Sequence, residues 1–232
     1  MKPRIPLLGA GLFVPGSDRA KARPRMDRGS LIAFEGVEGA GKTTQIERLA
    51  EALRSRGHAV LVTREPGGTA LGTEIRRLVL DVREPPPVPM TELLLYLADR
   101  AQHLGEKVVP ALQRGDVVLT DRFSGSTIVY QGYARDLGLQ KVIELDALVR
   151  DGICPALTVL LDCPTEIGLA RAEGDDRFHR EKLAFHERVR SGFLELARVE
   201  GEEWCVIDAT VSADEVHERV LAAVLARLDS NQ

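Results

Sequence analysis

The sequence predicts an α/β fold with a five-stranded parallel sheet and helices on both faces. From Leu31 onward, short apolar runs alternate with segments of helical periodicity, which is the pattern of βαβ units. The runs are almost continuously apolar, as in strands that are covered on both faces. With 232 residues, 44% of them hydrophobic and 28% charged, the chain can form a substantial core. The expected strands are residues 31–35, 59–64, 117–121, 157–162 and 204–208.

The first 28 residues are expected to form a disordered tail outside this fold. An apolar run at residues 5–14 follows two basic residues, as in a signal peptide, but it lacks a small-residue cleavage site and is too short to span a membrane. Residues 15–28 are basic, proline-containing and aperiodic, and Met26 offers an alternative start. We therefore expect one domain at residues 29–229, a short tail at residues 230–232, and no membrane association.

Composition also bears on partners and compartment. A net charge of −4 argues against a dedicated nucleic-acid binder, which would show a basic face. The cysteines Cys154, Cys163 and Cys205 are odd in number and widely spaced, as expected of buried, reduced thiols. We therefore expect a cytoplasmic protein that does not bind nucleic acid.

Three of the expected helices follow from apolar periodicity. The first lies between the first two strands and ends at Gly57, and the last opens with the capping box of Ser212 and Glu215. Their apolar stripes are Ile46, Leu49, Ala50 and Leu53; Phe185, Val189, Phe193 and Leu196; and Val216, Val220, Val224 and Leu228.

The segment after the second strand is expected to be a loop, because the run Glu-Pro-Gly-Gly-Thr at residues 65–69 breaks helix and strand alike. It lies at the carboxyl end of a strand, where α/β sheets bind their ligands. A helix is expected at residues 71–81, then a proline linker at 85–89, then a helix at 92–104 capped by Thr91. Residues 93–97 make this last helix apolar all round, so we expect burial on several sides or a homodimer interface.

The strongest functional signal is a phosphate-binding loop between the first strand and the first helix. Its glycines allow backbone N–H groups to point at an anion, and the helix adds its positive N-terminus. Lys42 is expected to contact the β and γ phosphates of a nucleotide, and Thr43 to bind Mg²⁺. The weaker alternative is a glycine-rich turn that binds nothing. The loop consists of Gly36, Val37, Glu38, Gly39, Ala40, Gly41, Lys42, Thr43 and Thr44.

Two further polar stretches could complete a site. Asp121 and Arg122 follow the third apolar run, where the carboxylate can order Mg²⁺ and the guanidinium can bind a second phosphate; the alternative is a surface ion pair. Residues 171–178 are polar and bracketed by helices, as in a closing lid, so that Arg171 and Arg177 could reach a transferring phosphoryl group. The alternative there is a solvated charged loop.

Five motifs, in order after the phosphate-binding loop, resemble those of thymidylate kinase. The resemblance covers about residues 30–228 and implies the fold of the P-loop nucleoside monophosphate kinases. It also implies phosphorylation of dTMP to dTDP by ATP with Mg²⁺ in dTTP biosynthesis, and a homodimer. The motifs are Arg64-Glu65-Pro66-Gly67-Gly68-Thr69, Ala98-Asp99-Arg100-Ala101-Gln102-His103, Asp121-Arg122-Phe123, Tyr130-Gln131-Gly132 and Ile207-Asp208-Ala209-Thr210.

The resemblance implies roles for individual residues. The phosphate-binding loop and Arg171 would bind ATP, with Thr43 on Mg²⁺ and Asp121 as a second candidate ligand. The bacterial subtype carries its catalytic arginines in the lid when the loop has none, and none lies in this loop. The implied catalytic residues are Lys42, Arg122, Arg171 and Arg177. The implied dTMP-binding residues are Glu38, Arg64, Pro66, Tyr96, Arg100, Arg122, Thr127, Tyr130 and Gln131.

Within the dTMP set, the resemblance implies a division of labour. Arg122 and Arg100 would hold the phosphate and the thymine edge, and Tyr96 would stack on the base. Thr127 and Gln131, one helical turn apart, would hydrogen-bond the thymine ring. Tyr130 would crowd C2′ and disfavour ribonucleotides, Glu38 would approach the 3′-hydroxyl, and Pro66 would wall the pocket.

These residues also have structural alternatives, and the sequence departs from the family in two places. The tyrosines could be core aromatics, Thr127 and Gln131 could lie on a helix surface, and Arg64 and Arg100 could form structural ion pairs. His179 stands where the family has a lid glutamate, for which Glu181 could substitute, and Gly125 replaces a more usual polar residue.

Two other functions are compatible with a phosphate-binding loop. The first is that of another nucleoside monophosphate or deoxynucleoside kinase with a different acceptor. A P-loop regulatory switch is less favoured, because guanine-specific switches use an Asn-Lys-x-Asp loop and the only asparagine here is Asn231.

Overall fold

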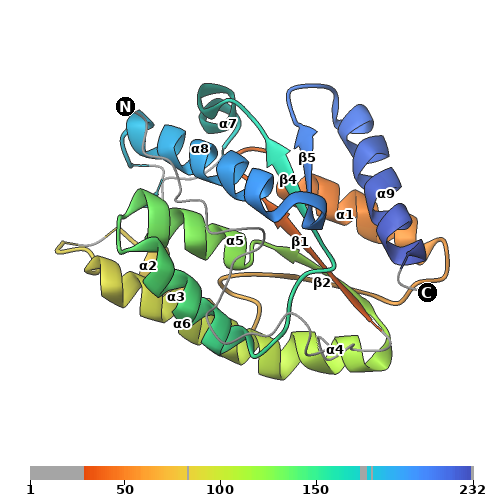
Figure 1. Cartoon of the computed structure of the whole chain (residues 1–232), viewed down its shortest axis with the longest axis horizontal. Helices are drawn as coiled ribbons and strands as arrows, with labels where there is room; N and C mark the ends of the chain where they lie inside the picture. Colours follow the sequence, from red (N-terminus) through yellow and green to blue (C-terminus); the bar gives the residue numbers. More distant parts are fainter. Residues whose placement is uncertain (1–28, 83, 173–176, 179, 231–232) are drawn as a thin grey trace.

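The chain folds around a five-stranded sheet in which every paired strand is parallel to its neighbour (Figure 1). The computed structural model describes residues 29–82, 84–172, 177–178 and 180–230. The strand order across the sheet is β2-β3-β1-β4-β5. The strands are β1 Ser30–Glu35, β2 Val60–Arg64, β3 Val117–Asp121, β4 Leu157–Asp162 and β5 Trp204–Asp208. Each predicted strand is present, so the α/β prediction is confirmed.

Helices pack on both faces of the sheet. On β1, Leu31 and Ala33 belong to a core cluster formed with η1 and α4, whereas Ile32 and Phe34 belong to the larger core formed with α1, α8 and α9. The helices are α1 Lys42–Arg54, α2 Ala70–Leu80, α3 Pro89–His103, η1 Leu104–Val108, α4 Val109–Arg114, α5 Ser124–Thr127, η2 Ile128–Ala134, α6 Leu139–Arg150, α7 Thr165–Arg171, α8 Leu183–Glu200, η3 Gly201–Glu203 and α9 Ala213–Asp229.

The two outer strands differ from the prediction that all strands are covered on both faces. Val62 of β2 is 39% exposed and Val206 of β5 is 49% exposed, because these strands form the edges of the sheet. The inner strands β1, β3 and β4 are almost entirely buried. A continuous apolar run therefore predicts a strand but does not reveal its place in the sheet.

The predicted apolar stripes of α1, α8 and α9 face the core. The residues of all three stripes are buried except Phe185, which is half-buried. The capping box of α9 is also present, since the Ser212 side chain accepts from the Glu215 N–H while the Glu215 carboxylate accepts from the Ser212 N–H. Periodicity and capping chemistry were thus sufficient to define these elements.

Both α2 and α3 begin earlier in the structure than the sequence predicts. Thr69 caps α2 by accepting from the Gly72 N–H, and α2 begins one residue earlier than expected. Thr91, in contrast, is not a cap, because α3 begins at Pro89 with Val88 as its N-cap residue. Proline has no N–H to satisfy and is favoured at the first helical position. On α3, Leu93 and Leu97 are buried but Leu94 is 52% exposed, so the helix is not covered all round by its own chain.

The prediction that the cysteines are buried is wrong for one of them. All three thiols are free; Cys163 is buried, Cys205 is half-buried and Cys154 is exposed. Among the described residues, no helix is long and apolar enough to cross a membrane. The predicted tail at residues 1–28 lies outside the described residues, as do residues 173–176 of the expected lid.

Candidate active site

A cavity of about 630 Å³ opens at the carboxyl edge of the sheet. The segments that follow β1, β2 and β3 contribute to its wall, together with residues from α2, α3, η2 and the end of α7. Most of the predicted site residues line it, so the structure brings them together in one place, and their roles stay predictions. Those that do are Glu38, Gly39, Gly41, Lys42, Thr43, Thr44, Arg64, Pro66, Tyr96, Arg100, Asp121, Arg122, Thr127, Tyr130, Gln131 and Arg171.

The phosphate-binding loop has the backbone shape that its glycines predict. Gly36, Gly39 and Gly41 have φ angles of 141°, 69° and 90°, which side chains disfavour, and α1 begins at Lys42 directly after them. The Lys42 ammonium donates to the carbonyl oxygens of Gly36 at 3.1 Å and Val37 at 2.9 Å, so it lies across the loop. Burial and the nearby Arg122 charge together lower the pKa of Lys42 to about 8. An anion in the loop would offset both effects.

Thr43 and Asp121 converge at the edge of this loop. The Thr43 hydroxyl lies 3.5 Å from Oδ2 of Asp121, and Oδ1 of Asp121 is buried without a hydrogen-bond partner among the described residues. Oxygen ligands and an unsatisfied carboxylate oxygen suit Mg²⁺, which usually binds one or two protein oxygens together with phosphates and water. The described residues hold no cluster of three or more His, Cys, Asp or Glu that could bind a metal alone. The two residues therefore fit a metal that enters with the nucleotide.

Arg122 links the phosphate-binding loop to the segment that follows β3. It has a φ angle of 69°, and its guanidinium donates to the Gly36 carbonyl at 3.1 Å, to the Ser126 hydroxyl at 3.0 Å and to Glu38 at 3.0 Å. The Tyr130 hydroxyl also donates to Glu38, at 2.8 Å. Burial would raise the pKa of Glu38, but the charges of Arg122 and Lys42 and the hydrogen bonds of His186 and Tyr130 together outweigh it and hold the pKa well below its usual range. Glu38 is therefore an ionised group within the phosphate-binding loop.

Glu35, which the sequence gave no reason to single out, supports this arrangement from beneath. Its carboxylate is fully buried at the end of β1 and accepts from the N–H groups of Phe123 and Ser126 and from the Ser126 hydroxyl. It thus fixes the turn on which Arg122 sits. The structure also explains why glycine stands at position 125, where the family more usually has a polar residue. A Cβ at that position would lie 2.8 Å from the Glu35 carboxylate.

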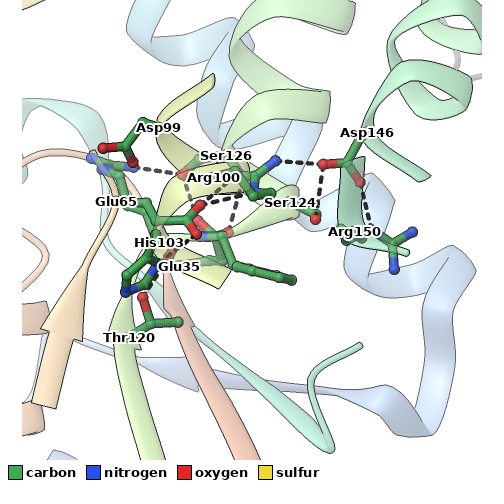
Figure 2. Close-up of polar contacts among 12 residues, drawn as sticks. Glu35, Glu65, Asp99, Arg100, His103, Thr120, Ser124, Ser126, Asp146 and Arg150 are labelled. Carbon is green, nitrogen blue, oxygen red and sulfur yellow. Dashed lines mark hydrogen bonds and ion pairs between the residues drawn. The ribbon is translucent and has the colours of Figure 1, made fainter. Parts of the chain in front are cut away.

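Arg100 lies in a buried ion-pair network beside the cavity (Figure 2). Its guanidinium donates to Glu65 at 2.8 Å and to Asp146, and Asp146 also accepts from Arg150 at 2.7 Å. Burial would lower the pKa of Arg100, but the two carboxylates raise it. In this arrangement Arg100 ties the loop after β2 to α6, and its predicted contact with the base stays a prediction.

The predicted base-binding residues share one wall. Thr127 and Gln131 are each 2% exposed and lie on opposite sides of the junction between α5 and the π-helix η2, while Tyr96 projects from α3. Pro66 accepts from Arg76 through its carbonyl at 2.9 Å, Arg64 lies close to Arg76, and all three residues line the cavity. Arg76 also lines the cavity, but sequence reasoning missed it because nothing in its helix separated it from the adjacent Arg77.

The two lid arginines occupy different places. Arg171 ends α7, lines the cavity and donates to the Ala209 carbonyl at 3.0 Å. Arg177 is not among the lining residues; it donates to the Val79 carbonyl at 3.1 Å and to Glu92 at 2.5 Å. Its catalytic role therefore stays a prediction that requires it to move. His179 lies outside the described residues, and its proposed substitute Glu181 pairs with Arg135 at 2.6 Å instead.

The remaining loop residues Gly36, Val37 and Ala40 do not line the cavity by their own atoms. Val37 and Ala40 are buried in the core, and Gly36 packs against β4, where a Cβ would lie 2.6 Å from the Leu161 carbonyl. These three positions shape the loop from below, and the other six present it to the cavity.

Known proteins are similar to this chain over most of its length. Residues 34–220 match the family model of thymidylate kinase. The thymidylate kinases of Geobacter sulfurreducens and Geotalea uraniireducens are each 49% identical to the chain over 209 residues, covering 86% of this chain and 98% of the relative. That of Desulfosudis oleivorans is 48% identical over 212 residues, covering 87% of this chain and 99% of the relative. The chain therefore belongs to the thymidylate kinase family.

Proposed function

We propose that this protein transfers the γ-phosphoryl group of ATP to dTMP, giving dTDP and ADP as a step of dTTP biosynthesis. The observation that carries the proposal is the joining of two half-sites in one cavity. A phosphate-binding loop with an intact Lys42 and Thr43 faces a second set of groups suited to a pyrimidine monophosphate, led by Arg122 and Gln131. Membership in the family agrees with this assignment.

The donor half holds the triphosphate. Backbone N–H groups of residues 39–44 and the N-terminus of α1 surround the phosphates, and Lys42 turns from the Gly36 and Val37 carbonyls to the β and γ oxygens. Arg171, at the end of α7, contacts the nucleotide from the opposite side. Thr43 and Asp121 would hold Mg²⁺, directly or through water, and the ion would supply positive charge to the phosphates.

The acceptor half holds dTMP by its phosphate and its base. Arg122 binds the phosphate, with Arg64 and Arg76 supplying further positive charge on the same wall. Tyr96 stacks on the thymine, and Thr127 and Gln131 hydrogen-bond its edge. Glu38, held by Tyr130, approaches the 3′-hydroxyl from within the phosphate-binding loop.

The chemistry explains why the cavity is rich in arginine and needs no general base. The attacking phosphate oxygen has its second pKa near 6, so it is anionic at neutral pH. The task is to bring two polyanions together and to stabilise the charge of the transferred group, which positioning and electrostatics accomplish. Arg122, Arg171 and Arg177 are the residues that supply this charge.

The protein is proposed to act as a cytoplasmic homodimer. Exposed leucines lie on α3 and on the two helices that it packs against: Leu94 on α3, Leu71 on α2 and Leu148 on α6. A second subunit would cover such a face. Sedimentation velocity of the purified chain tests this part separately, and a single monomeric species at micromolar concentration would contradict it.

Substrate profiling of the purified full chain tests the activity. ADP release is followed by a coupled assay with ATP, Mg²⁺ and each of dTMP, dUMP, UMP, CMP and thymidine in turn. The proposal expects dTMP to give the highest kcat/KM, and Lys42→Ala to abolish turnover while the far-UV circular dichroism is retained. Faster turnover of any other acceptor would favour the rival reading, a nucleoside monophosphate or deoxynucleoside kinase of different specificity.

A further inference from the structure

Glu92 lies just behind the base-binding wall of the cavity. It belongs to the first turn of α3, is 1% exposed and does not line the cavity itself. Its Oε1 accepts from the side-chain amide nitrogen of Gln131 at 2.8 Å, and Gln131 is a lining residue. The contact therefore joins a buried carboxylate to a group that faces the substrate.

The carboxylate of Glu92 is held in place by two guanidinium groups. Arg177 donates to Oε2 at 2.5 Å, and Arg135 lies 3.6 Å from Oε1. An ionised carboxylate has acceptor oxygens only, so its partner on Gln131 must be the NH₂ group and not the carbonyl oxygen. Both neighbours are positively charged, and the orientation of the Gln131 amide follows from hydrogen-bond chemistry.

The consequence for the cavity is a fixed acceptor atom. With its NH₂ group turned to Glu92, Gln131 has its carbonyl oxygen Oε1 available as the acceptor, and none of the described residues is shown donating to that oxygen. A thymine or uracil ring carries an N–H donor at N3, whereas cytosine carries an acceptor lone pair there. Oε1 of Gln131 would accept a hydrogen bond from N3–H of thymine or uracil. Cytosine would instead place its N3 lone pair against the lone pairs of Oε1.

We propose that Glu92 is a positioning residue that sets base specificity: it locks the Gln131 amide so that Oε1 accepts from N3–H of a 4-keto pyrimidine and rejects cytosine. This rests on the proposed function, in which Gln131 meets the acceptor base. Glu92 acts through Gln131 and needs no contact with the nucleotide. A site that hydrogen-bonds one edge of a substrate rejects an analogue with the wrong edge strongly, because a buried polar group is then left unpaired.

Substitution of Glu92 by glutamine tests the proposal. In Glu92→Gln the new amide can donate or accept, so the Gln131 amide is free to turn and present either face. The ratio of kcat/KM for dTMP to that for dCMP should fall by about tenfold or more, mainly through KM. This ratio does not depend on how much of the enzyme is active, so partial loss of folded protein does not alter it.

Two further variants separate this role from a merely structural one. Glu92→Asp keeps an acceptor-only carboxylate and should retain the ratio even if activity falls. Glu144→Gln changes a Gln–Glu hydrogen bond of the same 2.8 Å length on the exposed face of α6. It should leave kcat/KM for dTMP and for dCMP unchanged. A purely structural Glu92 would lower both activities together, and an unchanged ratio in Glu92→Gln would overturn the proposal.

A measurement on the wild-type chain covers the case in which Glu92→Gln fails to fold. Side-chain amide resonances of Gln131, assigned with Gln131→Leu, should be protected from solvent exchange and should shift little on adding dTMP. Rapid exchange in the unliganded protein would place the NH₂ group in the cavity and overturn the inference. Preference of the wild type for dCMP would instead sink the proposed function, so the two failures are distinguishable.

Discussion

Arg122 and Glu38, which are 84 residues apart in the sequence, form an ion pair of 3.0 Å inside the cavity. One residue follows β3 and the other belongs to the phosphate-binding loop, so the pair joins the two sides of the cavity that we propose for the acceptor and the donor. The same guanidinium donates to the Gly36 carbonyl. A change at Arg122 should therefore affect both nucleotides.

Arg122→Gln should lower kcat/KM for dTMP by roughly 10² to 10³, because a charged, buried phosphate contact is lost and Glu38 is left without its cation. Initial velocities at varied dTMP and fixed ATP measure this. The control is Arg198→Gln, which breaks an exposed ion pair with Glu195 on α8. Equal effects of the two substitutions would mean that Arg122 is not a site residue.

Arg177→Ala should reduce kcat by about 10² or more while changing the KM for dTMP little, because its proposed role is confined to the transition state. Arg177 donates to Glu92 in the structure, so a large loss of kcat would also indicate that Arg177 leaves Glu92 during turnover. Arg188→Ala, on the exposed face of α8, is the control. A raised KM with unchanged kcat would move Arg177 to the acceptor site.

Gly168→Ala should impair both folding stability and turnover. Gly168 lies on α7, where a Cβ would come within 2.5 Å of the Glu38 carbonyl oxygen, so a methyl group there would push the phosphate-binding loop away from Arg171. Gly105→Ala is the matched control, since a Cβ at Gly105 meets nothing within 4 Å. Thermal unfolding and steady-state kinetics on the two variants measure this. If Gly168→Ala were as active and stable as Gly105→Ala, α7 would not pack on the loop in solution.

Asp99→Asn should stabilise the fold at neutral pH. Asp99 is fully buried, and burial raises its pKa to about 6. The folded state then binds this proton more tightly than the unfolded state, where the pKa is about 3.9, so stability is gained as pH falls from about 6 towards 4. Asparagine removes that proton linkage. It can still accept from the Gly67 N–H, which lies 3.0 Å from Oδ1 of Asp99.

Urea unfolding at two pH values measures this effect. At pH 7.5 the variant should exceed the wild type by up to about 3 kcal/mol, which is roughly two pKa units at about 1.4 kcal/mol each, and the advantage should vanish by about pH 4. Asp229→Asn, at the exposed end of α9, serves as the control. A constant difference at both pH values would exclude the titration of Asp99 as the cause.

The sequence was sufficient for the sheet and the main helices, because these depend on local patterns. Apolar runs defined the strands, and the glycine spacing defined the phosphate-binding loop. The resemblance to thymidylate kinase, which rested on five ordered motifs, is confirmed by the family match. Most residues it implied do meet in one cavity.

What the sequence could not provide depends on tertiary pairing. Glu35 lies in a strand and Glu92 in a helix. Their hydrogen-bond partners lie on other elements, so the spacing of residues in the sequence does not predict these contacts. The edge positions of β2 and β5 follow from strand order, which apolar content does not encode. Thr91 has the side chain of a cap, but Pro89 occupies the first helical position and starts the helix before it.

The most direct test of the central claim is the fate of the transferred phosphoryl group. ATP, Mg²⁺ and dTMP are incubated with the purified chain, and the products are followed by ³¹P NMR. The account predicts that dTDP and ADP appear in equal amounts, with no inorganic phosphate while dTMP remains. Inorganic phosphate and ADP without dTDP would mean that water is the acceptor, and would contradict the two-nucleotide site described for this cavity.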